Sequence, residues 1–133
     1  MVKTIFFLFF GISTFYSPAV PQTDVISMLS QNFRLGNAKE IGKNLAPTLE
    51  LILIEEEDVY SKVQGEQIIK DFFLKYPPVK SVVIHKINGN QNFRFGVLTL
   101  TTTKGVFRIS ITLKKIDKDF LVTELRIEPA KAE

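Results

Sequence analysis

His85 is the only histidine of the chain, and the chain has no cysteine. An imidazole can transfer protons near neutral pH, hold a metal ion or donate a hydrogen bond to a ligand. A transition-metal site would need carboxylates alone beside His85, because no second imidazole and no thiolate is available. We expect His85 on a strand, with Val83 and Ile87 on its face. The pattern favours a structural histidine, with ligand binding or catalysis as the alternative.

The acidic residues offer little to complete a catalytic pair with His85. A histidine–aspartate pair would need an aspartate in the interior, but the aspartates fall mostly at expected helix caps and loops. Glu55–Asp58 is a run of four acids that lacks the spaced oxygen ligands and the glycine turn of a calcium loop. We interpret this run as a solvated loop. The sequence therefore indicates no cofactor and no metal ion.

Tyr60 and Tyr76 flank the longest helix that the sequence predicts. A phenol at the mouth of a cavity can bind a ligand, although a core aromatic with its hydroxyl at the boundary is the commoner case. Together with Phe72 and His85, the two tyrosines are the candidate ligand-binding residues. The ligand that they imply is small and apolar.

Arg94, Arg108 and Arg126 fall on three successive predicted strands, and Glu124 is near two of them. Such a strip can bind an anion or a partner protein. Cross-strand charge pairing on an exposed face is the simpler interpretation. Because apolar side chains also alternate along this face, it is nevertheless the candidate for a homodimer interface.

These side chains must be positioned by a helix over Ser61–Tyr76 and by the elements around it. The apolar positions of this segment recur with the 3.6-residue period of a helix, and Pro77 and Pro78 end it. The members of its apolar stripe are Gly65, Ile68, Ile69, Phe72, Phe73 and Tyr76. The elements expected before it are a helix capped by Asp24 and running to Leu35, a helix over Ala38–Leu45 ended by Pro47, a strand over Thr48–Ile54, and a short strand at Val59 and Tyr60.

Four strands are expected after the prolines, and the turns between them are short enough to force antiparallel neighbours. Asn88-Gly89-Asn90 is expected to make the first of these turns. The strands are Val79–Asn88, Gln91–Thr102, Val106–Ile116 and Phe120–Glu128. The fold class is therefore α+β, with three helices against a curved antiparallel sheet.

Alternation orients the two faces of this sheet. One face of the third strand carries Phe107, Ile109, Ile111 and Leu113. In the fourth strand Leu121, Thr123, Leu125 and Ile127 share a face, opposite Phe120, Val122, Glu124 and Arg126. The apolar face must meet the helices, and the mixed face meets water or a second subunit.

The first nineteen residues are expected to be a signal peptide, which leaves residues 20–133 as a single domain. Lys3 precedes an apolar stretch, and small residues allow cleavage after Ala19. A membrane anchor or a buried first strand is the alternative. Without cysteine the exported chain carries no lipid anchor, so we expect a soluble periplasmic or secreted protein. Its 17 basic residues are scattered along the sequence, which argues against a nucleic-acid partner.

The order of these elements resembles the nuclear transport factor 2-like superfamily, a cone-shaped α+β barrel. The segment Leu35-Gly36-Asn37-Ala38 resembles its helix-turn-helix opening, and the Gly65 to Phe73 segment resembles its central helix. Within the superfamily, a family of small exported bacterial proteins of unknown function resembles this chain over residues 24–128. The residues that carry this resemblance include Tyr60-Ser61-Lys62, Pro77-Pro78, His85-Lys86, Gly105-Val106-Phe107-Arg108-Ile109 and Leu125-Arg126-Ile127-Glu128.

The superfamily includes isomerases, cyclases and dehydratases as well as binding and dimerisation modules. By this resemblance the isomerase's catalytic base falls on Leu53 and its tyrosine on Leu29, and neither leucine can move a proton or donate a hydrogen bond. We therefore expect a non-catalytic binding or interaction protein, homodimeric, that holds a small apolar ligand or a protein partner. The alternatives are a cyclase-, dehydratase- or hydrolase-like enzyme that uses His85, and a structural protein with a filled core.

Overall fold

The computed structural model describes residues 24–131, so the expected signal peptide over residues 1–19 lies outside the described part of the chain. Three helices and six strands follow one another in the expected order. They are α1 (Val25–Leu35), α2 (Ala38–Lys43), β1 (Leu45–Leu53), β2 (Glu56–Ser61), α3 (Lys62–Lys75), β3 (Pro78–Asn90), β4 (Phe93–Thr102), β5 (Gly105–Ile116) and β6 (Asp119–Pro129).

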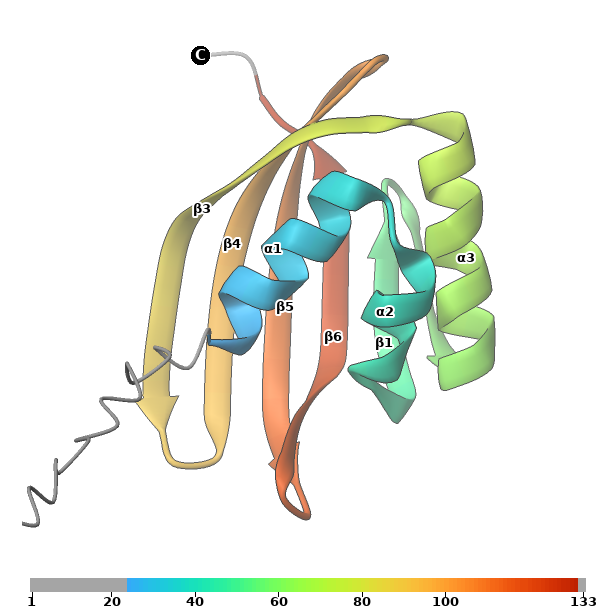
Figure 1. Cartoon of the computed structure of the whole chain (residues 1–133). Coiled ribbons are helices and arrows are strands. Elements are labelled where there is room, and N and C mark those ends of the chain that lie inside the picture. The colour runs from blue at the N-terminus through green and yellow to red at the C-terminus, as the bar shows by residue number, and fades with distance from the viewer. Residues whose placement is uncertain (1–23, 132–133) are drawn as a thin grey trace, which may run out of the picture.

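The six strands form one sheet in the order β2-β1-β6-β5-β4-β3 (Figure 1). Strands β3 to β6 make the expected antiparallel meander. The expectation of an all-antiparallel sheet is wrong at one pair, because β1 lies parallel to β6. The sheet is curved but does not close into the expected cone-shaped barrel, since β2 and β3 remain its two edges.

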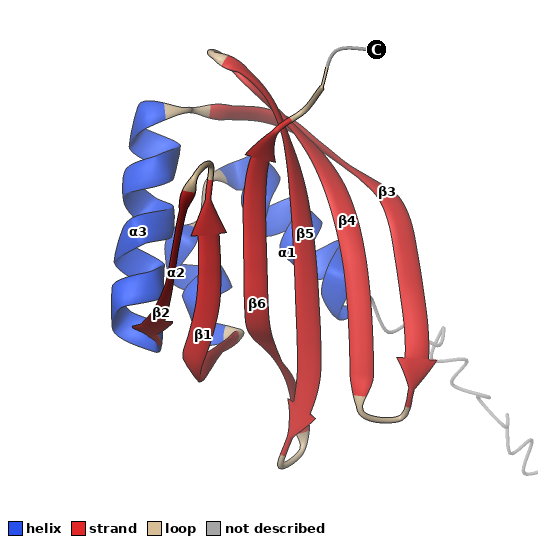
Figure 2. Cartoon of the chain, turned by 180° about the vertical axis from the view of Figure 1, so that it is seen from behind, coloured by secondary structure: helices blue, strands red, loops and turns tan. Residues whose placement is uncertain are grey.

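The helices lie on one face of the sheet and leave the other face uncovered, as the two opposite views show (Figures 1 and 2). We call the uncovered face the outer sheet face. Helix α1 begins where the side chain of Asp24 accepts the Ser27 N–H, and it ends at Gly36, whose φ of 64° suits a residue without Cβ. Helix α3 begins with a capping box between Ser61 and Gln64.

The apolar stripe of α3 packs into the core, as its periodicity predicts. Ile69, Phe72 and Phe73 are buried, and Ile68 and Tyr76 lie at the border of the core. The Phe72 ring meets the Phe107 ring of β5 edge-on, with 5.1 Å between ring centroids. The Tyr76 ring contacts the same Phe107 ring, with 4.8 Å between ring centroids. Aromatic edge-to-face contacts therefore join the helix to the middle of the sheet.

The second helix is shorter than expected, because Leu45 belongs to β1 and not to α2. Leu45 is fully buried and lies opposite Val122 of β6, and the Val122 N–H donates to the Asn44 carbonyl at 2.7 Å. Pro47 is tolerated within β1 because it falls where the register with β6 is interrupted, so no N–H is needed there. Pairing with a distant strand thus overrides the local helical pattern.

Two turns also differ from the expectation. Glu56, Glu57 and Asp58 are exposed as expected, but they belong to the edge strand β2 and not to a loop. The first turn of the meander comes after Asn90, because the Asn90 side chain accepts the Asn92 N–H at 2.8 Å and sets the bend there.

The expected alternation holds along β5 and fails in the first half of β6. Thr112 lies opposite Glu124 but Leu113 lies opposite Val122, which leaves Thr123 as an extra residue in β6. Val122 is therefore buried on the helix side, together with Leu125 and Ile127. The expectation that placed Val122 on the opposite face is wrong.

Removing the aromatic contact between α3 and the sheet is the direct test of this core. Phe72→Ala is expected to lower the free energy of unfolding by about 3–5 kcal/mol, because a buried ring is replaced by a cavity. Leu74→Ala on the same helix is the control, since Leu74 is 72% exposed, and its cost should stay within about 0.5 kcal/mol. Denaturant unfolding measures both, and equal small losses would contradict the central place of Phe72.

The pair between Asp24 and Lys86 gives a second test, because it ties the start of α1 to β3. Burial raises the pKa of Asp24, but hydrogen bonds from Lys86 and Ser27 outweigh burial and leave this pKa below its usual value. The stability that Asp24 contributes is thus present above about pH 4 and is lost as the pH falls through the lowered pKa.

Asp24→Asn keeps a good cap but removes the charge. It is expected to lower the free energy of unfolding by about 0.2–1 kcal/mol at neutral pH, as a partly exposed ion pair does. Unfolding midpoints measured at descending pH should converge for the two proteins in acid. A difference that is independent of pH would show that the charge of Asp24 contributes nothing.

Candidate functional site

Two of the candidate ligand-binding residues lie together, and the third aromatic lies in a neighbouring groove. The rings of Phe72 and Tyr76 are 5.1 Å apart, and both residues line a groove of about 270 Å³ at the end of β1. Tyr60 lines a separate groove with Val63 and Ile68. Ile68 borders both grooves, so the aromatic candidates follow the flank of α3 that faces β1 and β2.

Two leucines occupy the positions that the resemblance aligns with the isomerase's catalytic pair. Leu29 is fully buried in α1, and Leu53 is a partly buried residue that packs against the core.

His85 lies on the opposite side of the sheet from the tyrosines. Val83 pairs with Leu98 and His85 pairs with Val97, so the extra residue between them puts their side chains on opposite faces. The expectation that Val83 shares the face of His85 is wrong, whereas Ile87 does share it. His85 is exposed on the outer sheet face, and the structure does not bring it to Tyr60, Phe72 or Tyr76.

The four charged interface candidates divide between the two faces. Register places Arg108, Glu124 and Arg126 on the outer sheet face. Arg94 pairs with the buried Leu113 and so belongs to the helix side. There its guanidinium stacks 4.3 Å from the Phe120 ring centroid, and its Nη1 donates to the Asn90 and Phe93 carbonyls at 2.6 and 2.8 Å. Arg94 therefore stabilises the turn between β3 and β4.

Carboxylates gather at one part of the outer sheet face. Glu50 of β1 lies directly opposite Glu124 of β6. A hydrogen bond with the Glu57 carboxyl group raises the pKa of Glu50, and desolvation and the charge of Glu124 raise it further, against the effect of Arg126. Arg126 bonds Glu128 at 2.9 Å, which raises the pKa of its guanidinium. These acids repel one another, and Arg126 compensates them only in part.

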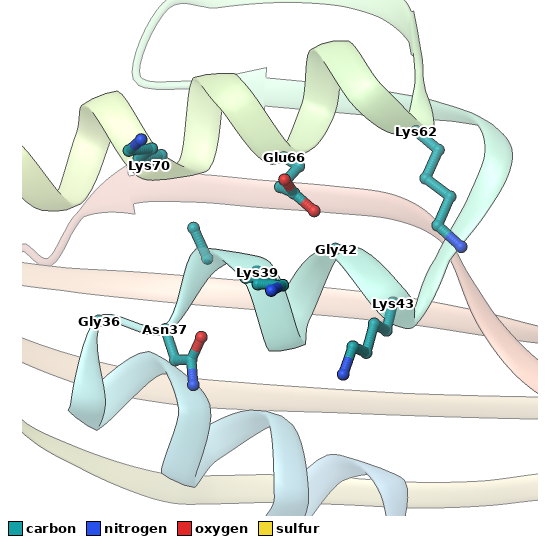
Figure 3. A pocket seen from close by; sticks show the side chains of 9 residues that line it. Gly36, Asn37, Lys39, Gly42, Lys43, Lys62, Glu66 and Lys70 are labelled. Carbon is teal, nitrogen blue, oxygen red and sulfur yellow. The ribbon is translucent and has the colours of Figure 1, made fainter.

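Lysines that are scattered in the sequence line one groove between α2 and α3 (Figure 3). Lys39 and Lys43 come from α2, and Lys62 and Lys70 come from α3, with Glu66 between them. We call this space of about 510 Å³ the lysine groove. Its signal in the sequence is the four-residue spacing of Lys39 to Lys43 and of Lys62, Glu66 and Lys70, which puts each set on one side of its helix. This cluster was not predicted from the sequence.

No three His, Asp or Glu side chains of residues 24–131 are arranged to hold a metal ion. None of the helices in this range has both the length and the apolar character that crossing a membrane requires.

Comparison with solved structures shows which proteins share this fold. A DUF4783 family protein from Bacteroides uniformis is 22% identical to this chain with a TM-score of 0.78, and the match covers 82% of this chain and 100% of that protein. A DUF4783 family protein from Bacteroides ovatus is 24% identical with a TM-score of 0.74, and the match covers 78% of this chain and 94% of that protein. A domain of unknown function with a cystatin-like fold from Nostoc punctiforme is 9% identical with a TM-score of 0.63, covering 77% and 71%.

At these identities the solved structures establish the fold alone. The comparison with curated proteins gives no match. The sequence profile of the domain of unknown function DUF4783 matches residues 26–128, and family members are among the solved structures just described. The chain therefore belongs to the DUF4783 family, within a cystatin-like, nuclear transport factor 2-like group of folds.

Proposed function

We propose that this chain is an exported, non-catalytic interaction protein that forms a homodimer through its outer sheet face. The observation that carries the proposal is an uneven distribution of charge on a sheet face that no described helix covers (Figure 2). Glu50, Glu57 and Glu124 crowd around Arg126 on β1, β2 and β6, whereas Arg108 lies on β5, opposite Glu128. Because Glu128 is paired with Arg126, the guanidinium of Arg108 can meet an acid of a second copy.

A two-fold axis near β6 would bring the acids of one subunit over the arginine of the other. Such an interface is isologous, so each contact is made twice. The raised pKa of Glu50 supports this arrangement, because the hydrogen bond with Glu57, desolvation and the charge of Glu124 raise it more than Arg126 lowers it. Arg108 and Lys131 line a groove of about 690 Å³ at the other end of the face, together with Glu128, and they supply the complementary charges. Complementary potentials of this kind fix the orientation of two subunits.

The β3 side of the face offers apolar surface to an interface. Val97 and Ile52 also point outwards by register, but neighbouring side chains already cover them in the single chain. Val82 and Ile87 of the edge strand β3 are exposed and apolar on the same face. Exposed apolar side chains beside charged ones are a usual composition of a protein–protein interface.

The filled core favours interaction over catalysis or the transport of an apolar ligand. Phe72, Tyr76 and Phe107 contact one another on the helix side of the sheet, so a ligand there would have to displace them. His85 lies on the outer sheet face. The alternative enzyme would need His85 and a carboxylate together in the interior, and this position of His85 speaks against it. A small apolar ligand would be limited to the grooves beside Tyr60 and Tyr76.

Charge reversal tests the dimer. Arg108→Glu is expected to weaken dimerisation at least tenfold, because like charges that face each other across an interface cost several kcal/mol. The double variant Arg108→Glu with Glu50→Lys should recover the dimer, since both charges are exchanged together. Sedimentation equilibrium measures the dissociation constant, and Lys104→Glu in a turn is the control of equal charge. A monomeric native protein, or a double variant that stays monomeric, would rule out this interface.

Export is tested on protein from its own host. Lys3 and the apolar stretch after it are expected to be removed together with Ala19. Mass spectrometry of the native protein should find an N-terminus at Val20 or a close neighbour. A chain that retains Met1 would contradict export by a cleaved signal.

A further inference from the structure

We propose that the lysine groove binds an extended acidic peptide segment of a partner protein. The groove lies between α2 and α3 on the helix side of the chain, away from the outer sheet face (Figures 1 and 3). The proposal therefore does not depend on the homodimer. Its basis is the positive charge of the groove, the position of Glu66 within it, and the types of side chain that line it.

Three of the four lysines have no ion-pair partner among residues 24–131. Lys43 bonds Glu40 at 2.8 Å, and the ion pairs of the described chain include none with Lys39, Lys62 or Lys70. Glu66 is four residues from both Lys62 and Lys70, which is the spacing of a helical ion pair, yet it pairs with neither. The lysine groove thus keeps an excess of positive charge.

The reason that Glu66 does not pair is its contact with Gly42. A Cβ at Gly42 would lie 2.1 Å from the Glu66 Oε1, so the carboxylate occupies the space that a side chain of α2 would fill. Figure 3 shows Glu66 pointing from α3 towards Gly42, between Lys62 and Lys43 at one end and Lys70 at the other. The missing side chain of Gly42 therefore leaves room for the carboxylate against α2, and Lys62 and Lys70 stay without an ion pair among the described residues.

This arrangement matches carboxylates that are separated by hydrogen-bond donors. Lysines at the two ends can each meet a carboxylate as point charges. Glu66 between them can only accept hydrogen bonds, which suits the N–H groups of a peptide backbone and repels a continuous row of phosphates. Among residues 24–131, none of the side chains that line the groove is aromatic, so they offer nucleic-acid bases no surface to stack on. An acidic peptide supplies carboxylates for the lysines and backbone N–H groups for Glu66, and it needs no aromatic surface.

The first experiment measures fluorescence anisotropy of a labelled oligoglutamate peptide with the full mature chain at low salt. Lys62→Gln with Lys70→Gln is expected to weaken binding roughly three- to tenfold, as the loss of two exposed ion pairs does. Lys114→Gln with Lys118→Gln, on β5 and the turn after it, removes the same charge elsewhere and should leave the affinity unchanged. An equal loss in the control pair, or no binding to the native chain, would overturn the proposal.

The second experiment changes the groove without removing a lysine. Gly42→Ala should push Glu66 out towards Lys62 or Lys70 and weaken binding of the same peptide roughly threefold or more, because an exposed helical pair then competes with the ligand. Adding Glu66→Gln to Gly42→Ala should restore the affinity. Circular dichroism checks that both variants are folded. An unchanged affinity in Gly42→Ala would show that the contact does not control the groove.

Competition separates the peptide from other occupants. Inorganic polyphosphate and a single-stranded oligonucleotide of matched charge should displace the oligoglutamate peptide less well than unlabelled peptide does. Equal displacement would overturn the proposal in favour of general polyanion binding. Self-association that is lost in the Lys62/Lys70 variant would overturn it as well, because the exposed acids of β2 in a second copy would then be the occupant. The Arg108→Glu variant should bind the peptide normally, whether or not the homodimer exists.

Discussion

The packing of α3 against the curved sheet is the contact on which the rest of the structure depends. The rings of Phe72 and Tyr76 both meet Phe107 of β5, and the ring centroids of Phe73 and Phe33 of α1 are 5.7 Å apart, so α3 contacts both the sheet and α1. Dense aromatic packing leaves little freedom in such a core. Because the helix side is filled in this way, the surfaces that remain for function are the outer sheet face and the grooves between elements.

Much of this core could be predicted from the sequence because it depends on local periodicity. The stripe of α3 and the alternation of β5 both follow from the spacing of apolar residues. The bulges at Ile84 and Thr123 left no such signal, and each reversed the direction of the side chains beyond it. Val83 was therefore expected on the face of His85, and Val122 was assigned to the wrong face. Leu45 was assigned to a helix because its partner strand is far away in the sequence.

The candidate sites were less predictable, because they depend on which elements meet. Arg94 was grouped with Arg108 and Arg126 because all three lie on strands of the meander. In the pairing of β4 with β5, however, Arg94 lies opposite the buried Leu113 and so belongs to the helix side of the sheet. The lysines of the groove had helical spacing within each segment. The two segments face each other because α2 packs on α3, where Gly42 leaves room for Glu66. The spacing within each segment could not predict this packing.

The parallel pairing of β1 with β6 governs when the molecule can fold. Strand β1 is complete early in the chain, yet its central neighbour is the last strand, and β2 is its only other partner. Closing such a distant pair costs loop entropy before any contact compensates for it, which slows folding. A nascent chain therefore cannot complete its sheet until β6 has left the ribosome, and until then β1 has only the edge strand β2 as a partner.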